Sequence, residues 1–204
     1  MITRKFRKRF GISCGAVVLS FTCSPTQASD SVAPLSVLIV YHSASGNTEK
    51  MAQAVAEGAK GISGAKVLLK RVGEVAAEDL VSSDAVIVGT PVYFGNMSGE
   101  VKTFFDNWNL KFRLSQERRM ANKVGGAFAT GASISSGKEL TILSIIGAML
   151  LNQMIIVSGG GGFSATATTG PTSPGIDDKE VAEAQDLGKR VAEIAAAIKR
   201  GSAK

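Results

Sequence analysis

The chain has 204 residues, of which 45% are hydrophobic and 20% are charged, and this is enough apolar material for one well-buried domain. Five of the 23 basic residues lie within residues 4–9, and the other 18 nearly balance the 17 acidic residues, which excludes a broad nucleic-acid-binding surface on the remaining chain. Cys14 and Cys23 both lie in residues 1–28, which we expect to be removed as a leader, so the mature chain should contain no cysteine and no disulfide, thiolate catalysis, iron–sulfur cluster or zinc-thiolate site. With His42 as the only histidine, we expect no metal site.

Residues 1–28 have the layout of a secretory signal peptide. Basic residues precede an apolar run at residues 10–21, and Thr26 and Ala28 are small residues at the positions that a cut after Ala28 requires. We expect export to the periplasm, a linker at residues 29–34 and one domain at residues 35–204. About 12 apolar residues are too few to cross a bilayer. A retained signal anchor and a lipoprotein modified at Cys23 are the alternatives.

From residue 35 onward, short apolar runs alternate with segments of helical spacing. Strands without polar alternation are typical of parallel sheets covered by helices on both faces. The order β-α, repeated five times, predicts an α/β fold with a doubly wound five-stranded parallel sheet, whose ligand crevice lies at the carboxyl ends of the strands. The expected strands are residues 36–41, 66–69, 84–89, 123–129 and 154–157.

Three later segments bear on the fold and on the ligand site, and two of them have alternative interpretations. Residues 141–157 are very apolar, but Asn152 and Gln153 favour a buried helix followed by a strand over a membrane span. The glycine- and threonine-rich residues 159–175 are expected to form a loop. Residues 107–119 are interpreted either as a cover for the ligand or a neighbouring subunit, or as an extended helix with a solvated charged face.

The first candidate ligand loop follows the first strand. It combines short hydroxyl and amide side chains with a glycine at a helix start, where backbone N–H groups and the helix dipole favour a phosphate. The loop contains no basic residue and no Walker or dinucleotide fingerprint. An ordinary helix cap by Ser45 or Asn47 is the alternative. The predicted phosphate loop is Ser43, Ala44, Ser45, Gly46, Asn47 and Thr48.

Two further loops follow the third and fourth strands. The first has a proline that stiffens the turn and aromatic residues that can pack on a flat ring, and the second is small and polar. A phosphate loop beside two loops suited to a planar heterocycle predicts a mononucleotide with a large ring, and FMN fits better than AMP. The predicted ring contacts are Pro91, Val92, Tyr93, Phe94, Gly95 and Asn96, together with Thr130, Gly131, Ala132, Ser133, Ser135, Ser136 and Gly137.

In these loops and in the helix at residues 51–59, the chain resembles the flavodoxin-fold NAD(P)H:quinone oxidoreductases related to the tryptophan-repressor-binding protein. The resemblance covers roughly residues 35–199. It implies the flavodoxin-like strand order 2-1-3-4-5, FMN as cofactor with residues 43–48 at its phosphate, NADH or NADPH as donor, a quinone as acceptor, and homodimers or homotetramers. The chain departs from that family at Tyr93, where those enzymes carry an arginine, and at residues 151–153, which replace a histidine-bearing segment of their substrate pocket.

Two functions follow from these observations. In the first, the flavin passes two electrons from a nicotinamide to a quinone, and no side chain acts as a general acid. In the second, the protein is a flavodoxin-type carrier between protein partners, but its balanced charge offers little electrostatic docking. A flavin-dependent reductase of another acceptor and a structural flavoprotein are further alternatives.

Overall fold

The computed structural model describes residues 34–159, 161–170 and 175–202, so the expected signal peptide and most of the expected linker lie outside the described residues. The helices and strands are, in chain order, β1 (Leu35–Tyr41), α1 (Asn47–Lys60), β2 (Ala65–Arg71), the 3₁₀ turn η1 (Val72–Glu74), α2 (Ala77–Ser82), β3 (Ala85–Tyr93), β4 (Asn96–Met97), α3 (Gly99–Leu110), β5 (Val124–Gly131), α4 (Lys138–Leu151), β6 (Ile155–Ile156), β7 (Thr166–Thr168) and α5 (Asp178–Ser202).

The sheet has the order β2-β1-β3-β5-β6, and all neighbours in this series are parallel. This confirms the predicted order 2-1-3-4-5, because β4 is only a short hairpin partner of β3. The edge strand β2 alternates between half-buried and exposed side chains along most of its length, so it is not covered on both faces as the interior strands are. Because the strands of this series are parallel, they all end at one edge of the sheet, here called the carboxyl edge.

The far side of the sheet differs from the expectation. The fifth strand is divided: β6 pairs with the first residues of β5, and β7 pairs with its last three. The expectation of a loop throughout residues 159–175 is wrong at Thr166–Thr168. The backbone at the end of β5 would otherwise have an unpaired edge, and β7 supplies its hydrogen-bond partners.

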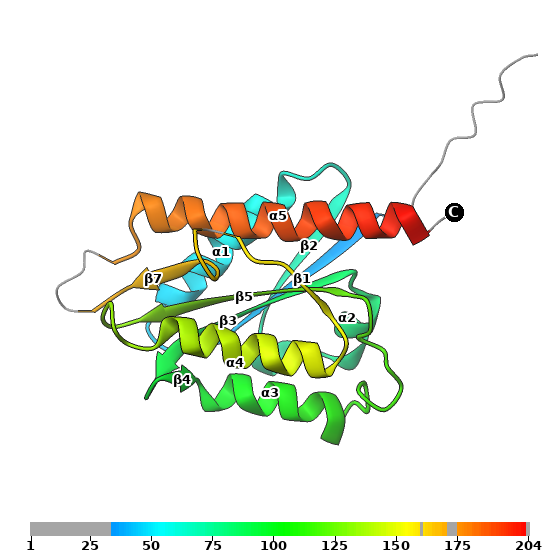
Figure 1. Ribbon diagram of the computed structural model, residues 1–204, viewed down its shortest axis with the longest axis horizontal. Coiled ribbons are helices and arrows are strands. Elements are labelled where there is room, and N and C mark those ends of the chain that lie inside the picture. Colours follow the sequence, from blue (N-terminus) through cyan, green and yellow to red (C-terminus); the bar gives the residue numbers. More distant parts are fainter. Residues whose placement is uncertain (1–33, 160, 171–174, 203–204) are drawn as a thin grey trace, which may run out of the picture. The chain divides into compact units, whose positions relative to one another are not determined.

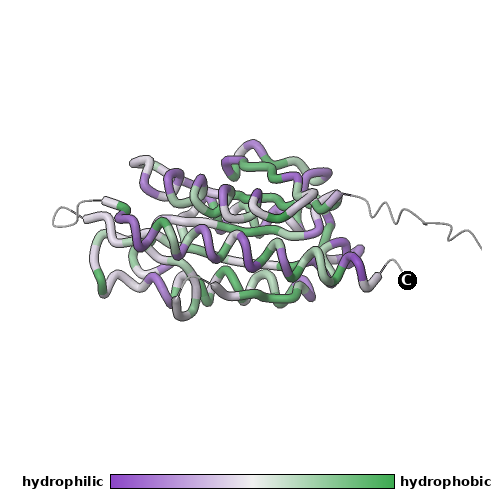
Figure 2. Tube along the Cα trace, turned by 90° about the horizontal axis from the view of Figure 1, so that it is seen from above, coloured by the Kyte–Doolittle hydropathy of each residue, from purple (hydrophilic) through white to green (hydrophobic). Residues whose placement is uncertain are grey.

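Helices cover both faces of the sheet (Figure 1). α1 and α5 lie on one face, while α2, α3 and α4 lie on the other, and each face has its own cluster of buried apolar side chains. Figure 2 shows hydrophobic residues concentrated in the strands and polar residues recurring along the helices. The helices start near the carboxyl edge after β1, β3 and β5, so three helix N-termini meet the loops predicted to bind a ligand.

The apolar segment 141–157 contains the predicted helix and a short strand. Ile142, Ile145 and Met149 of α4 are buried, whereas Leu140 and Leu151 are exposed, so the helix is buried on one side only. Within the described ranges no helix is long and apolar enough to cross a bilayer.

The predicted extension of a helix through residue 119 is wrong. α3 ends at Leu110, where Trp108 is fully buried against Phe104 and Phe105, and turns follow as far as the start of β5. Because this segment leads into the first residue of β5, it lies at the amino edge of the sheet. It therefore cannot cover a ligand bound by the same chain at the carboxyl edge.

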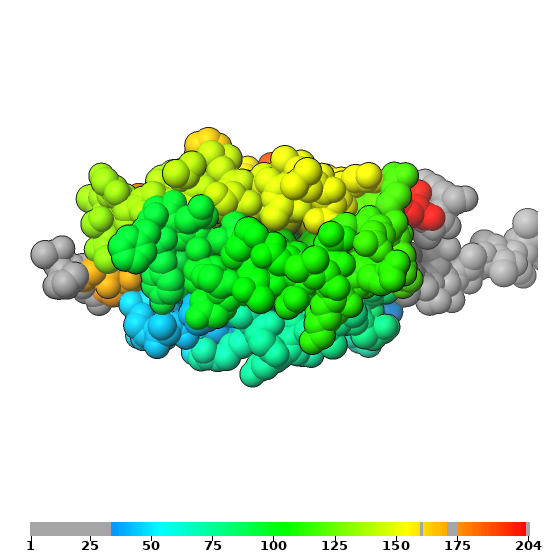
Figure 3. Space-filling model, turned by 90° about the horizontal axis from the view of Figure 1, so that it is seen from below, coloured from blue at the N-terminus to red at the C-terminus, as the bar shows by residue number. Residues whose placement is uncertain are grey.

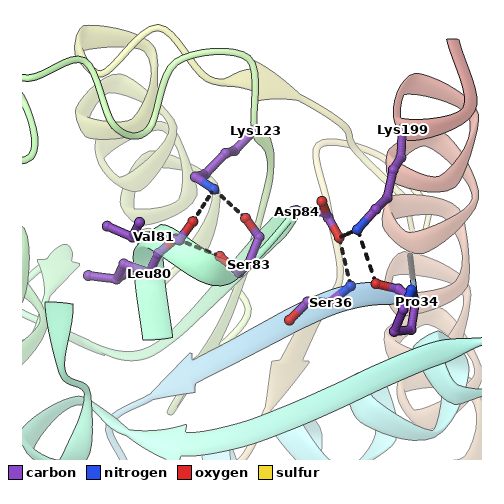
Figure 4. A network of polar contacts seen from close by, with 8 residues as sticks. All are labelled: Pro34, Ser36, Leu80, Val81, Ser83, Asp84, Lys123 and Lys199. Carbon is purple, nitrogen blue, oxygen red and sulfur yellow. Dashed lines mark hydrogen bonds and ion pairs between the residues drawn. The ribbon is translucent and has the colours of Figure 1, made fainter. Parts of the chain in front are cut away.

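A polar network ties the ends of the domain together at the amino edge (Figure 4). Asp84 Oδ2 accepts hydrogen bonds from the Ser36 N–H at 2.8 Å and from Lys199 Nζ at 2.6 Å, and Lys199 also donates to the Pro34 carbonyl at 3.0 Å. Lys123 Nζ donates to the carbonyl oxygens of Val81 and Ser83. The end of α5 is thus fixed to the start of β1.

Candidate ligand site at the carboxyl edge

The three predicted loops converge at the carboxyl edge. The Thr48 and Thr130 hydroxyl oxygens are 2.8 Å apart and join the first loop to the third. The third loop also touches the second, since a Cβ placed on Gly137 would be 3.0 Å from the Gly95 Cα. The fold therefore brings residues 43–48, 93–96 and 130–137 into one continuous surface.

The first loop presents free backbone donors. Gly46 is the N-cap of α1 with φ +89°, and no side chain caps the helix. Ser45 Oγ accepts a hydrogen bond from Asn47 Nδ2, at 3.4 Å, and neither side chain caps α1, so the alternative of a helix cap by Ser45 or Asn47 is wrong. Within the described ranges, the N–H groups of Ser45, Asn47 and Thr48 have no hydrogen-bond partner. This arrangement fits a phosphate group.

Arg71, which the sequence reading missed, holds this loop from the neighbouring strand. Its Nη1 donates to the Ser43 carbonyl at 3.1 Å, and its Nη2 donates to Glu49 Oε2 at 2.6 Å. Glu49 also accepts from the Tyr41 hydroxyl at 2.8 Å. Burial raises the pKa of the Tyr41 phenol, and the hydrogen bond to Glu49 raises it further. Because Glu49 pairs with Arg71, the guanidinium positions the loop more than it offers charge to a ligand.

The second loop is a hairpin rather than a turn begun by Pro91. β3 continues through Pro91 to Tyr93, and the two-residue turn consists of Phe94 with φ +51° and Gly95 with φ +76°. Positive φ at both central residues is typical of a type I′ turn, and it is costly for phenylalanine. Phe94 is fully exposed at the tip, whereas Val92 packs against the core.

His42 lies beside this hairpin. Its ring meets Tyr93 edge to face at 6.5 Å between centroids, and its Nε2 is 3.6 Å from Glu100 Oε2. The pKa of the Glu100 carboxyl is lowered by a hydrogen bond from the backbone N–H of Glu100 itself, with smaller contributions from the Ser98 side chain and His42. An acid at the first turn of α3 and an aromatic side chain thus border the edge of the site.

The third loop has exposed residues on its outer side and buried residues beneath them. Thr130 and Gly131 are the buried last residues of β5, and the Gly131 carbonyl accepts from the Thr169 N–H at 2.8 Å. Ala132, Ser133 and Ser135 are exposed, while Ser136 Oγ is a buried atom without a partner in the described chain. Lys138, which the sequence reading also missed, lies buried beneath this loop.

Two hollows border α3. One of about 990 Å³ lies between α3 and α4, which lie side by side in Figure 3, and it extends from Asn96 and Met97 to Leu151 and Asn152. The other, of about 730 Å³, lies between α3 and residues 71–75. Residues 43–48 and 130–137 line neither hollow; in the predicted phosphate loop Ala44 and Ser45 are exposed, whereas Ser43 and Thr48 are buried.

The departure from the family at residues 151–153 lies at the far end of the hollow that begins at Asn96, away from the three loops of the same chain. Leu151 is the last residue of α4, a 14-residue helix that begins at the carboxyl edge, and Asn152 and Gln153 follow it. At 1.5 Å per residue they lie about 20 Å away from its start.

In the described ranges no group of three His, Cys, Asp or Glu side chains could hold a metal ion.

Fold and site together define a flavodoxin-like α/β protein with a donor-rich ligand edge. The family model "NADPH-dependent FMN reductase" matches residues 73–169. An NAD(P)H dehydrogenase (quinone) of Archaeoglobus fulgidus is 36% identical over 192 residues, covering 78% of this chain and 96% of the relative, and one of Syntrophobacter fumaroxidans is 32% identical, covering 81% and 100%. The chain therefore belongs to the NAD(P)H dehydrogenase (quinone) family.

A solved structure agrees with this assignment. A flavodoxin, WrbA-like protein, from Agrobacterium tumefaciens is 28% identical, with a TM-score of 0.69 over 80% of this chain and 98% of its own. A flavodoxin from the domain Archaea, 22% identical with a TM-score of 0.63, shares the fold.

Proposed function

We propose that this protein is an FMN-dependent oxidoreductase that passes two electrons from NADH or NADPH to a quinone. Its relatives are named for this activity, and the family model that it matches is an FMN reductase. The observation that carries the proposal is the convergence of a phosphate-type loop with two ring-type loops at one edge of the sheet. When bound, FMN supplies the acceptance of a hydride and its release to the acceptor.

The protein's own residues would bind and orient the reactants. The free N–H groups of Ser45, Asn47 and Thr48 would hold the phosphate, and Arg71 keeps that loop in place through the Ser43 carbonyl. Tyr93 and Phe94, both exposed, would provide apolar surface for a flat ring. By holding the cofactor and the substrates in fixed positions, these residues would accelerate the electron transfer without a catalytic side chain.

The first test is spectroscopic. The purified full-length chain is titrated with FMN, reduced anaerobically with NADH or NADPH, and then mixed with a soluble quinone. We expect a flavin spectrum, rapid bleaching and quinone-driven recovery. A protein that takes up no FMN contradicts the proposal, and slow bleaching with either nicotinamide would favour the electron carrier.

The phosphate loop has a matched pair of variants. Gly46 and Gly64 both have positive φ, +89° and +77°, and in both cases an added Cβ meets no atom within 4 Å. Alanine strains both turns similarly, but only Gly46 lies at the site. Gly46→Ala is expected to weaken FMN binding about tenfold, while Gly64→Ala leaves it unchanged; equal effects would contradict the assignment of residues 43–48 to the phosphate.

We also propose that the chain is exported and acts in the periplasm after removal of residues 1–28. The basic and apolar layout of these residues supports the proposal. Fractionation of expressing cells, with N-terminal sequencing of the product, tests it. A product that retains residue 1 and sediments with membranes would identify a signal anchor instead.

A homodimer or homotetramer is the proposed assembly. Exposed leucines on the outer side of α4, namely Leu140, Leu143, Leu150 and Leu151, support it, because contiguous exposed apolar surface is uncommon on monomers. Light scattering during size-exclusion chromatography measures the mass, and a monomer at micromolar concentration would contradict this assembly.

A further inference from the structure

Lys138 is a buried cation at the start of α4, directly beneath the third loop. Its residue surface is 4% exposed. Its Nζ donates to the Ser133 carbonyl at 2.9 Å, to Thr168 Oγ1 at 2.9 Å and, at the long distance of 3.5 Å, to the Ile134 carbonyl. In the part of the chain that the structure describes, no carboxylate forms an ion pair with it.

These bonds orient two peptide groups. In a planar trans peptide the C=O of one residue and the N–H of the next point in opposite directions, and the structure contains no cis peptide among its described residues. With the carbonyls of Ser133 and Ile134 turned inward to Lys138, the N–H groups of Ile134 and Ser135 point outward. Neither N–H has a hydrogen-bond partner within the described ranges. The loop therefore presents two adjacent free donors on its exposed side.

The charge of Lys138 also bears on the ligand. A buried ammonium with only neutral acceptors is costly, and an electron-rich group nearby reduces that cost. The N-terminus of α4 adds its positive dipole end at the same place. Both effects favour a ligand whose nearest atoms are acceptors or carry negative charge.

We propose that Lys138 is a positioning residue for the flavin: it holds the third loop so that the N–H groups of Ile134 and Ser135 bind acceptor atoms of the ring, and its charge favours the reduced cofactor. This inference rests on the proposed function. It assigns a role to Lys138 beyond the loops predicted from the sequence, and it makes the donors of residues 134 and 135 the ring contacts of this loop.

The test uses the full-length protein with Lys138→Met, which removes the charge and all three bonds, and Lys138→Gln, which keeps a donor but no charge. Lys102→Met is the control, since it removes an exposed cation from the first turn of α3, where Lys102 pairs with Asp106. The readouts are the FMN dissociation constant, the midpoint potential of the bound flavin, and the amide NMR shifts of Ile134 and Ser135 on FMN addition.

Lys138→Met should weaken FMN binding about tenfold or more, lower the midpoint potential and abolish the FMN-induced shifts of both amides. Lys138→Gln should lower the midpoint potential with a smaller loss of FMN affinity, and it is the deciding variant if Lys138→Met does not fold. Lys102→Met should change neither the potential nor the affinity. Wild-type affinity and potential in both Lys138 variants overturn the inference alone. A wild-type chain that binds no FMN overturns the proposed function, and this inference with it.

Discussion

At the scale of single residues, the site stores strain at Phe94. A phenylalanine with φ +51° adopts the left-handed conformation at a cost of about 1–2 kcal/mol, and yet its side chain is wholly exposed. The two-residue turn between β3 and β4 requires this φ, and the pairing of the two strands offsets its cost, so the strain belongs to the hairpin that presents the ring.

Two substitutions separate strain from contact. Phe94→Gly should raise the free energy of unfolding of the FMN-free protein by up to about 1 kcal/mol, because glycine adopts this φ freely, whereas Phe94→Ala keeps the strain and should change it little. Both should slow quinone reduction, since both lose the ring. Urea unfolding and steady-state rates measure the two effects, and a destabilising Phe94→Gly would contradict the assigned strain.

A single buried hydrogen bond links two of the loops. Thr48 and Thr130 are almost fully buried, so Thr48→Val leaves the Thr130 hydroxyl without a partner and should cost about 1–3 kcal/mol of stability as well as FMN affinity. Thr141→Val is the matched control. Its hydroxyl is buried and unpartnered already, so the change should be neutral or stabilising by urea unfolding. Equal losses in both variants would argue against the link between the loops.

At the scale of elements, the junction between α2 and β5 depends on Lys123. Burial lowers the pKa of the Lys123 ammonium, Arg119 and Lys199 lower it further, and Asp84 opposes them. The side chain nevertheless donates to two carbonyls at the end of α2. The charged form is therefore less favourable in the folded chain than in the unfolded one.

The sign of the pH dependence follows. Between the lowered folded-state pKa and the ordinary value of 10.5, the unfolded chain binds more protons, so the contribution of Lys123 to the free energy of unfolding rises with pH. Urea unfolding from neutral pH to about 10 should show stability increasing relative to Lys123→Met. A free energy of unfolding of the wild type that falls relative to that of Lys123→Met as the pH rises would contradict the lowered pKa.

At the scale of the whole molecule, one end of the domain carries the candidate ligand site and the other fixes the chain ends. The Lys199–Asp84 pair is about a quarter exposed on each side chain and bridges α5, β1 and the start of β3. Lys199→Met should cost about 1–2 kcal/mol, because it removes the ammonium that donates to Asp84 Oδ2 and leaves that oxygen the hydrogen bond from the Ser36 N–H, with Lys123 as a more distant charge. Lys189→Met, which breaks an exposed pair with Glu193 on α5, should cost less than about 0.5 kcal/mol. Thermal or urea unfolding distinguishes them, and similar losses would contradict a special role for the amino edge.

The sequence by itself determined the α/β alternation, the position of the carboxyl edge and the three loops, because apolar runs and helix starts are local properties of the chain. Only the tertiary structure could reveal Arg71 and Lys138 as supports of those loops. Arg71 is 28 residues from the carbonyl it binds, and Lys138 is 30 residues from Thr168. The tertiary structure also showed that the fifth strand is divided and that residues 107–119 and 151–153 lie away from the carboxyl edge. Such contacts depend on which strands become neighbours, and that is decided by packing across the whole sheet.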